Sequence, residues 1–294
     1  MYRLVFLLFR GVSLLPMSFF HALSELVVVI LSKIMRYRRD VVEQNIRTVF
    51  PNHSTKEVNQ LIHQFYRNFA DTFTESIKLF SLSKAQIDKR CTIDFTIVRQ
   101  LMQEGKSVQL MAAHQFNWEF VNQVIPGQLP GPYYFVYRTI QSPIFNRLFL
   151  FLRCKQGGKP VAAEAFAAAR DQLFAQPAAL ILGADQNPSN PQRALWIDFF
   201  GKATPFHPGP AKGAIAKNTA MVMLNLIRKK RGYYHLDARL IAPECAQYSP
   251  KQLTWLYKKE TEKLILENPA NYLWSHRRWR HQWQPAYGPV YKGE

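Results

Sequence analysis

The chain has 294 residues, of which 48% are hydrophobic and 14% aromatic, so it can bury a sizeable core and is not an intrinsically disordered protein. Its formal net charge of +18 favours an anionic partner: nucleic acid, an anionic membrane surface, or a phosphorylated or acidic substrate. The three cysteines are far apart and have no CxxC spacing. This argues against a disulfide framework or a zinc site and fits a reducing compartment.

The first 35 residues form a strongly apolar segment, which reads VFLLFRGVSLLPMSFFHALSELVVVILSKI over residues 5–34. Arg10, Pro16, His21 and Glu25 interrupt a run that would otherwise be long enough to cross a bilayer. A basic cluster follows, without a small-residue cleavage site, so we expect a membrane anchor over residues 1–35 rather than a cleaved signal. The anchor is either one imperfect spanning helix or an in-plane hairpin, with the basic cluster on the cytoplasmic side. A buried N-terminal core helix is the alternative.

Residues 36–90 have helical spacing throughout and are expected to form a helical lead-in. Pro51 ends the first predicted helix. Ser54 and Glu57 have the spacing of a capping box for the next helix, which carries an apolar stripe from Val58 to Phe80. A stripe of this kind is most simply explained by core packing.

From residue 91 onward, strand-like and helix-like segments alternate. Short apolar segments typical of strands cover residues 91–95, 108–113, 133–137, 178–183, 221–227 and 234–241. Segments with helical spacing cover residues 96–104, 118–125, 162–176, 211–218 and 252–267. We therefore predict an α/β core over residues 91–294, with a central, mostly parallel sheet flanked by helices. The basic, aromatic tail at residues 268–283 could stack on nucleic acid or lie at a membrane interface, and the N-terminal anchor favours the membrane.

The strongest candidate site is MAAHQFNWEF, residues 111–120, in which an apolar strand ends at His114. Reactive groups usually lie at strand ends in α/β sheets, and His is the natural general base near neutral pH. Glu119, across the turn, could fold back to orient the imidazole. With no Ser or Cys nucleophile nearby, the pair suits direct activation of a substrate hydroxyl. Spacing alone does not exclude a strand-capping His114 and a solvated Glu119, because His-x-x-x-x-Glu is common by chance.

The sequence around this motif resembles the late (secondary) acyltransferases of lipid A biosynthesis, the lauroyl and myristoyl transferase group of the lysophospholipid acyltransferase superfamily. The similarity extends over roughly residues 36–283, with blocks in the family's order. These blocks are VVEQNIRTVFPNHSTKEVNQLIHQFYRN, HQFNWE, YRTIQSPIFNRL, LILGADQNPS, WIDFFGKATPFHPGPAKGAIAKNTAMV and NPANYLWSHRRWR. The family often has Gly where this chain has Phe116, a departure that would narrow the entrance to the site.

The resemblance implies a glycerol-3-phosphate acyltransferase-like fold and a reaction. His114 would deprotonate a hydroxyl of a lipid A precursor, oriented by Glu119, and the oxygen would attack an acyl thioester, with acyl carrier protein as the expected donor. Arg138 is the candidate for binding acceptor phosphate or stabilising charge. The remaining residues that we expect to contact substrate or line the site are Asn117, Asp185 and Gln186, with Phe199, Phe200 and Gly201 as an apolar wall for the acyl chain.

The family implies a role in lipopolysaccharide synthesis at the bacterial inner membrane, with the catalytic domain on the cytoplasmic face. We expect no cofactor, because the sequence has no metal-ligand cluster and no Gly-rich phosphate loop. An alternative is an acyltransferase that acts on a lysophospholipid or an aminolipid, although Glu119 and the preceding Asn-Trp favour the lipid A group. A remote alternative is a basic, non-catalytic nucleic-acid-binding membrane protein, for which the net charge is the only support.

Overall fold

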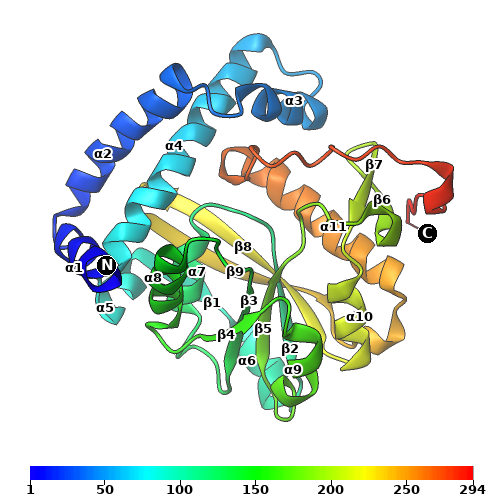
Figure 1. The fold of residues 1–294 in the computed structure, drawn as a ribbon. Coiled ribbons are helices and arrows are strands. Elements are labelled where there is room, and N and C mark those ends of the chain that lie inside the picture. Colours follow the sequence, from blue (N-terminus) through cyan, green and yellow to red (C-terminus); the bar gives the residue numbers. More distant parts are fainter. Residues whose placement is uncertain (294) are drawn as a thin grey trace.

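The computed structural model describes residues 1–293, and its centre is a seven-stranded sheet with helices on both faces (Figure 1). The strand order across the sheet is β1-β9-β8-β2-β5-β3-β4. The strands are β1 (Cys91–Asp94), β2 (Val108–Ala112), β3 (Tyr133–Tyr137), β4 (Lys159–Ala162), β5 (Ala179–Gly183), β8 (Ala220–Lys230) and β9 (Tyr233–Ala242). A separate antiparallel hairpin consists of β6 (Leu195–Phe199) and β7 (Lys202–Phe206). The predicted α/β fold with a mostly parallel sheet is confirmed.

Five neighbouring strands determine where the site lies. Strands β8, β2, β5, β3 and β4 run parallel, so their carboxyl ends meet at one edge of the sheet. Strand β9 returns antiparallel beside β8, and β1 runs parallel to β9. The loops after β2, β5 and β3 therefore emerge side by side.

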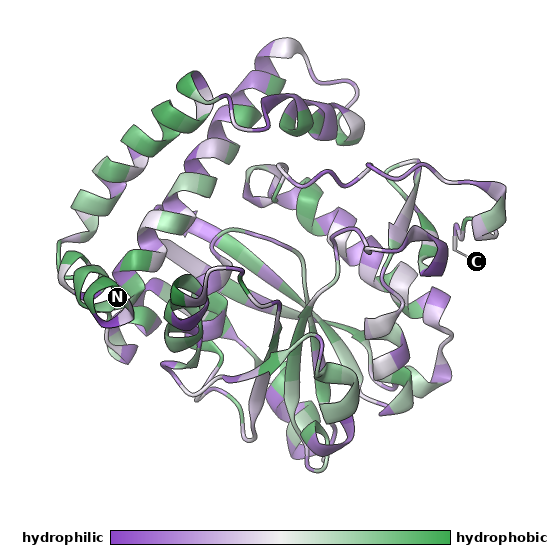
Figure 2. Ribbon diagram, viewed as in Figure 1, coloured by the Kyte–Doolittle hydropathy of each residue, from purple (hydrophilic) through white to green (hydrophobic). Residues whose placement is uncertain are grey.

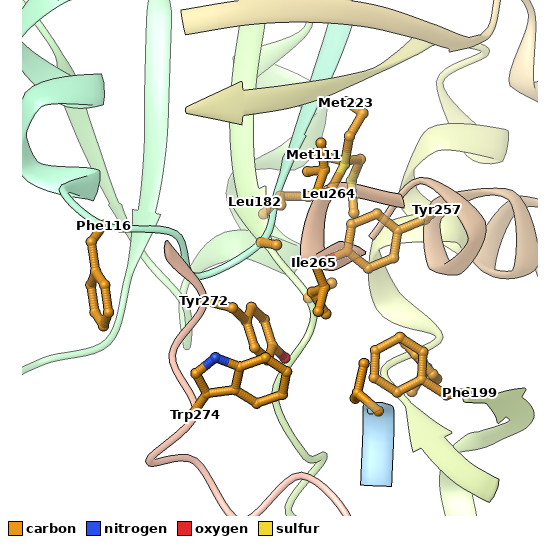
Figure 3. Close-up of a cluster of buried hydrophobic side chains, with 14 of the residues drawn as sticks. Met111, Phe116, Leu182, Phe199, Met223, Tyr257, Leu264, Ile265, Tyr272 and Trp274 are labelled. Carbon is orange, nitrogen blue, oxygen red and sulfur yellow. The ribbon is translucent and has the colours of Figure 1, made fainter. Parts of the chain in front are cut away.

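The two faces of the sheet are buried in two different apolar cores. Along β2, Leu110 packs into one core and Met111 into the other, and along β8 Val222 and Met223 alternate in the same way. Figure 3 shows part of the core that contains Met111, Met223 and Tyr257. A strand buried on both faces is a continuous apolar run, which is how β2 and β8 appear in the sequence.

Helices cover these faces and extend beyond them. The N-terminal helices are α1 (Tyr2–Val12), α2 (Met17–Val29) with its π-helical extension η1 (Ile30–Ile34), α3 (Arg39–Val49), α4 (Thr55–Leu79) and α5 (Lys84–Arg90). The later helices are α6 (Thr96–Gln103), α7 (Trp118–Val124), α8 (Pro143–Cys154), α9 (Phe166–Leu173), α10 (Gly209–Ala216) and α11 (Pro250–Glu267). Short 3-10 turns are η2 (Pro191–Arg193), η3 (Cys245–Gln247), η4 (Pro269–Asn271) and η5 (Pro285–Tyr287).

The lead-in helices follow the sequence prediction closely. Helix α3 ends two residues before Pro51, and the predicted capping box at the start of α4 is present, with Glu57 accepting from the Ser54 backbone N–H at 2.7 Å. Helix α4 runs along the length of the molecule (Figure 1) and buries Val58, Ile62, Phe65 and Phe69 of its predicted stripe, whereas Phe73 of the same stripe is 46% exposed.

The sequence did not predict α8, β4 or the β6–β7 hairpin. Helix α8 reads PIFNRLFLFLRC, in which the unbroken apolar run LFLFL over residues 148–152 fits a buried strand as well as a helix. The helix predicted over residues 162–176 is shorter, because its first residue belongs to β4 and α9 begins at Phe166. In the hairpin, Phe200 and Gly201 both have positive φ, of 52° and 74°, which a two-residue turn between antiparallel strands requires.

The N-terminal 35 residues lie against the outside of α4. Helices α1 and α2 are strongly apolar, and α2 runs alongside α4 (Figures 1 and 2). Residues Met17–Ile34 form one continuous helical segment of 18 residues with mean hydropathy 1.6, of which 17% are buried, so length and composition would allow it to cross a membrane. The alternative of a buried N-terminal core helix does not fit this exposure.

Candidate active site

His114 follows β2 at the carboxyl edge of the sheet, and Asp185 follows the adjacent strand β5. The two residues contact each other directly: His114 Nδ1 lies 2.5 Å from Asp185 Oδ1, and the His114 backbone N–H donates to Asp185 Oδ2 at 3.0 Å. Because a carboxylate only accepts, Nδ1 carries the proton. The side chain of His114 is 30% exposed, whereas that of Asp185 is 2% exposed, so Nε2 is the nitrogen available to a substrate.

The electrostatics of the pair favour an ionised carboxylate beside a basic imidazole. Burial alone would lower the pKa of His114, but the charge of Asp185 and its hydrogen bond outweigh burial and raise the pKa above its usual 6.5. Burial alone would raise the pKa of Asp185, but His114 and the nearby Arg278 lower it from 3.8 to about 2. The site therefore holds a fixed carboxylate that stabilises an imidazolium.

Gly183, the last residue of β5, allows the imidazole to approach the sheet. A Cβ at this position would lie 3.1 Å from His114 Cε1 and 3.7 Å from Nδ1. On its other side, the ring lies 6.1 Å from the Trp118 ring in an edge-on arrangement. The imidazole is thus held by Asp185, a glycine backbone and an indole.

The structure corrects the role expected for Glu119. Its carboxylate is bound by Arg153 of α8, from Nε to Oε2 at 3.0 Å and from the terminal nitrogen to Oε1 at 2.5 Å, and Trp118 Nε1 donates to Oε1 at 3.1 Å. Asp185, rather than Glu119, is the carboxylate on His114 Nδ1. Glu119 is 2% exposed, so it forms a buried ion pair that fixes Trp118 and α8 beside the site. Arg153 was missed because α8 was missed, and nothing in the spacing of 34 residues links it to Glu119.

Asn117 and Phe116, within the same motif, are buried. Asn117, which was expected to contact substrate, is 0% exposed and caps α7, accepting from the Glu119 backbone N–H at 3.2 Å. Phe116 is 1% exposed and packs between the Phe69 ring, at 5.8 Å, and the Trp118 ring, at 5.8 Å. Phe116 therefore fills space between α4 and the site, and does not stand in the entrance as expected.

The C-terminal tail holds the His114 turn in place. Leu273 N–H donates to the His114 carbonyl at 3.1 Å, and Phe116 N–H donates to the Asn271 carbonyl at 2.9 Å, so the turn and tail pair like strands. Trp274 is 0% exposed and Arg278 is 1% exposed, with the Arg278 guanidinium stacked 4.3 Å from the Phe206 ring. The sequence had suggested that the tail contacts nucleic acid or a membrane, but these two residues cannot do so because they are buried in the core.

The family of the chain follows from comparison with known protein families. The sequence profile described as bacterial lipid A biosynthesis acyltransferase matches residues 1–281. The chain belongs to this family. Among proteins of curated function, none matches the chain. The protein is therefore an acyltransferase of lipid A synthesis, a membrane-associated bacterial process whose acceptor is a lipid A precursor.

The other residues expected at the acyltransferase site lie in separate parts of the fold. Arg138 is exposed and directly follows β3, the strand beside β5, so it emerges at the same edge of the sheet. Gln186 is half-buried next to Asp185. Phe200 and Gly201 form the turn of the β6–β7 hairpin, where the Phe200 N–H donates to Glu262 of α11 at 2.9 Å.

Phe199, the remaining residue of the expected apolar wall, is 0% exposed and stacks on Trp279 at 5.7 Å. Its described contacts join the hairpin to the tail, so it is a core residue of the acyltransferase. Within residues 1–293, no group of three or more His, Cys, Asp or Glu side chains could hold a metal ion.

Proposed function

We propose that this acyltransferase moves a fatty acyl chain from a thioester of acyl carrier protein to a hydroxyl of a phosphorylated lipid A precursor, at the cytoplasmic face of the bacterial inner membrane. The observation that carries the proposal is the His114–Asp185 pair, a partly exposed imidazole held by a buried carboxylate at a strand end. The proposal assigns the general base to His114 and the orienting carboxylate to Asp185.

The reaction follows from this pair. Nε2 of His114 removes the proton from the acceptor hydroxyl while Asp185 stabilises the imidazolium that forms. The hydroxyl oxygen attacks the thioester carbonyl and gives a tetrahedral oxyanion. Its collapse breaks the carbon–sulfur bond, and His114 returns the proton to the leaving thiolate. The products are an ester and a free thiol.

In this proposal, charged residues around the pair position the two substrates. Arg138 is our candidate for binding a phosphate of the acceptor, because it is an exposed cation at the same sheet edge. Glu119 acts indirectly, through its ion pair with Arg153, by keeping Trp118 against the imidazole. The net charge of +18 favours encounter with an acidic carrier protein.

We assign the acyl chain to the aromatic side of the site. Phe73 of α4 is 46% exposed and lies 4.9 Å from Phe69, which contacts Phe116, which in turn contacts Trp118 beside His114. Phe116 is 1% exposed, so these rings form a packed apolar wall whose accessible parts are Phe73 and the partly exposed Trp118.

The test is acyl transfer by purified protein in detergent, with acyl carrier protein thioester and lipid A precursor as substrates. A folded His114→Ala variant should lose roughly 10²–10⁴-fold in rate, the usual contribution of a general base. Activity close to the wild-type rate in that variant would eliminate the base. A rate with acyl-coenzyme A that equals or exceeds the rate with the carrier protein would eliminate the assigned donor.

A further inference from the structure

The outer surface of α1 and α2 is unusually apolar. Eleven of the seventeen large hydrophobic side chains that are exposed within residues 1–293 belong to the first 35 residues. The most exposed beyond Met1 include Leu4 at 75%, Leu14 at 68% and Ile34 at 72%. An exposed apolar surface of this kind indicates a binding partner, and the contacts on the inner side of α1 and α2 restrict what that partner can be.

The inner surface of α2 packs on the catalytic body through the buried Phe20 and Val28 and is also joined to it by polar contacts. Ser24 donates to Asp71 of α4 at 2.5 Å, and Asp71 is 0% exposed. Glu25 pairs with Arg67 of α4 at 3.0 Å and with Arg231 of the β8–β9 turn at 2.6 Å. Arg231 also donates to Asp71 at 2.6 Å, which closes a network between α2, α4 and the sheet around the buried Asp71.

Helix α1 is also attached to the catalytic body. Phe6 lies 4.8 Å from Phe151 of α8, Phe9 lies 6.4 Å from Phe145, and the Arg147 guanidinium stacks 4.2 Å from the Tyr2 ring. Phe145 and Phe151 are themselves 45% and 41% exposed, so they extend the apolar surface from α1 onto α8. The first residues of the chain thus lie beside α8, which carries Arg153 next to the site.

These contacts are incompatible with a spanning helix. The 18-residue segment Met17–Ile34 would be about 27 Å long, close to the thickness of the hydrocarbon core. To place it across a bilayer with its contacts intact, Arg67 and Arg231 would have to enter hydrocarbon. Otherwise α2 would have to leave α4, and Arg67 and Arg231 would lose their ion pairs with Glu25. Both are unfavourable, because charged groups are strongly disfavoured in that region.

We infer that α1 and α2 form an in-plane face that binds the surface of an anionic phospholipid bilayer, with the N-terminus and the catalytic body on the same side of the membrane. Exposed cations, among them Arg3, Lys33 and Arg36, lie within the same segment and complement anionic headgroups. This inference concerns attachment geometry and goes beyond the proposed reaction.

The in-plane face is also connected to the His114 turn. His21 of α2 lies 3.5 Å from Glu75 of α4, and Asn117, the residue that caps α7, donates to the same Glu75 carboxylate at 3.3 Å. One buried side chain thus contacts both the lipid-facing helix and the motif that contains His114. Lipid attachment would hold the site at a fixed height above the bilayer.

The first test is topology. Cleavable epitope tags are fused ahead of Met1 and after Glu294 of the full chain, and membrane vesicles of both orientations are exposed to an impermeant protease. The in-plane arrangement predicts that the two tags are cleaved in the same vesicle orientation. Cleavage in opposite orientations would show that the segment spans the bilayer and would overturn the inference. Neither outcome depends on acyl transfer.

The second test is binding to vesicles. Leu8→Glu with Leu26→Glu, both in the in-plane face, should lower the fraction of protein that floats with phosphatidylglycerol-containing vesicles by roughly tenfold or more, because two exposed leucines that the bilayer would bury are lost. The control, Leu240→Glu with Leu266→Glu, changes two exposed leucines outside the face, on β9 and α11, and should stay within about twofold of wild type.

Two outcomes of the vesicle-binding test would overturn the inference. One is equal flotation of both folded double variants. The other is a change from dimer to monomer in the face variant without loss of flotation, which would make this surface an interface between copies of the chain.

Discussion

Asp185→Asn tests the geometry of the site most sharply, because the two oxygens of Asp185 accept from two different donors. One oxygen accepts from the His114 backbone N–H and the other from Nδ1–H. An amide has a single acceptor oxygen. If that oxygen keeps the backbone N–H, the amide NH₂ faces Nδ1, so the proton moves to Nε2 and the imidazole cannot accept a proton from substrate.

The expected magnitudes follow from the same contacts. Loss of a correctly protonated base should reduce the acyl-transfer rate roughly 10²–10⁴-fold. The folded-state pKa of Asp185 is about 2, against 3.8 for the free group, so at neutral pH the carboxylate contributes about 2 kcal/mol to the free energy of unfolding. That contribution is fully present above pH 3.8 and is lost as the pH falls through about 2. The raised pKa of His114 adds stability below pH 6.5 that is lost as the pH rises through the higher folded value.

The assay compares pH–rate profiles and urea unfolding of wild type, Asp185→Asn and a control, Asp171→Asn, whose carboxyl side chain is 76% exposed. The wild-type rate should rise with pH through a pKa above 6.5, since the neutral imidazole is the base. In Asp185→Asn the residual rate should still rise with pH, but the midpoint of that rise should lie at a lower pH than in wild type. Burial lowers the pKa of His114 once the carboxylate charge is gone. A wild-type rate and profile in this variant would refute the assignment of Asp185 as the orienting carboxylate.

Three further changes test the surroundings of the pair. Glu119→Gln removes the counter-charge of Arg153 and should lower the free energy of unfolding by about 3 kcal/mol, measured by urea unfolding. Adding Arg153→Met should recover most of this loss, and an unchanged unfolding midpoint in the single variant would contradict a structural role. Gly183→Ala should reduce the transfer rate about tenfold without unfolding the protein. The new Cβ would lie 3.1 Å from His114 Cε1 and would displace the imidazole, so a wild-type rate would count against that packing. Asn117→Ala should cost about 1 kcal/mol of stability with an unchanged KM, whereas a raised KM with unchanged stability would indicate substrate contact.

The sequence predicted the fold best where the pattern was local. The apolar run of β2, the stripe of α4 and the capping box of Ser54 are all repeated or short-range signals, and each was found, except that Phe73 of the stripe is exposed. Helix α8 was missed because its central apolar run, residues 148–152, is as typical of a buried strand as of a helix.

The site was predictable in its location but not in its pairing. Strand order decides which loops meet, and nothing local shows that β5 lies beside β2 or that Asp185, 71 residues away, reaches Nδ1 of His114. Glu119 was the nearer carboxylate in sequence, but the distant Arg153 binds it. The burial of Arg278 in the tail was also not predictable from local sequence. A segment rich in basic and aromatic residues can lie in a core or at a membrane surface, and its composition does not distinguish the two.

The central claim is that this chain acylates a lipid A precursor with His114 as the base. Its most direct test is the mass profile of lipid A from cells that lack the gene, complemented either with wild type or with the His114→Ala variant. The account predicts lipid A lighter by one acyl chain in the deletion, restored by wild type and not by the variant. Unchanged lipid A in the deletion, with an acyl chain lost from phospholipids or aminolipids instead, would contradict it.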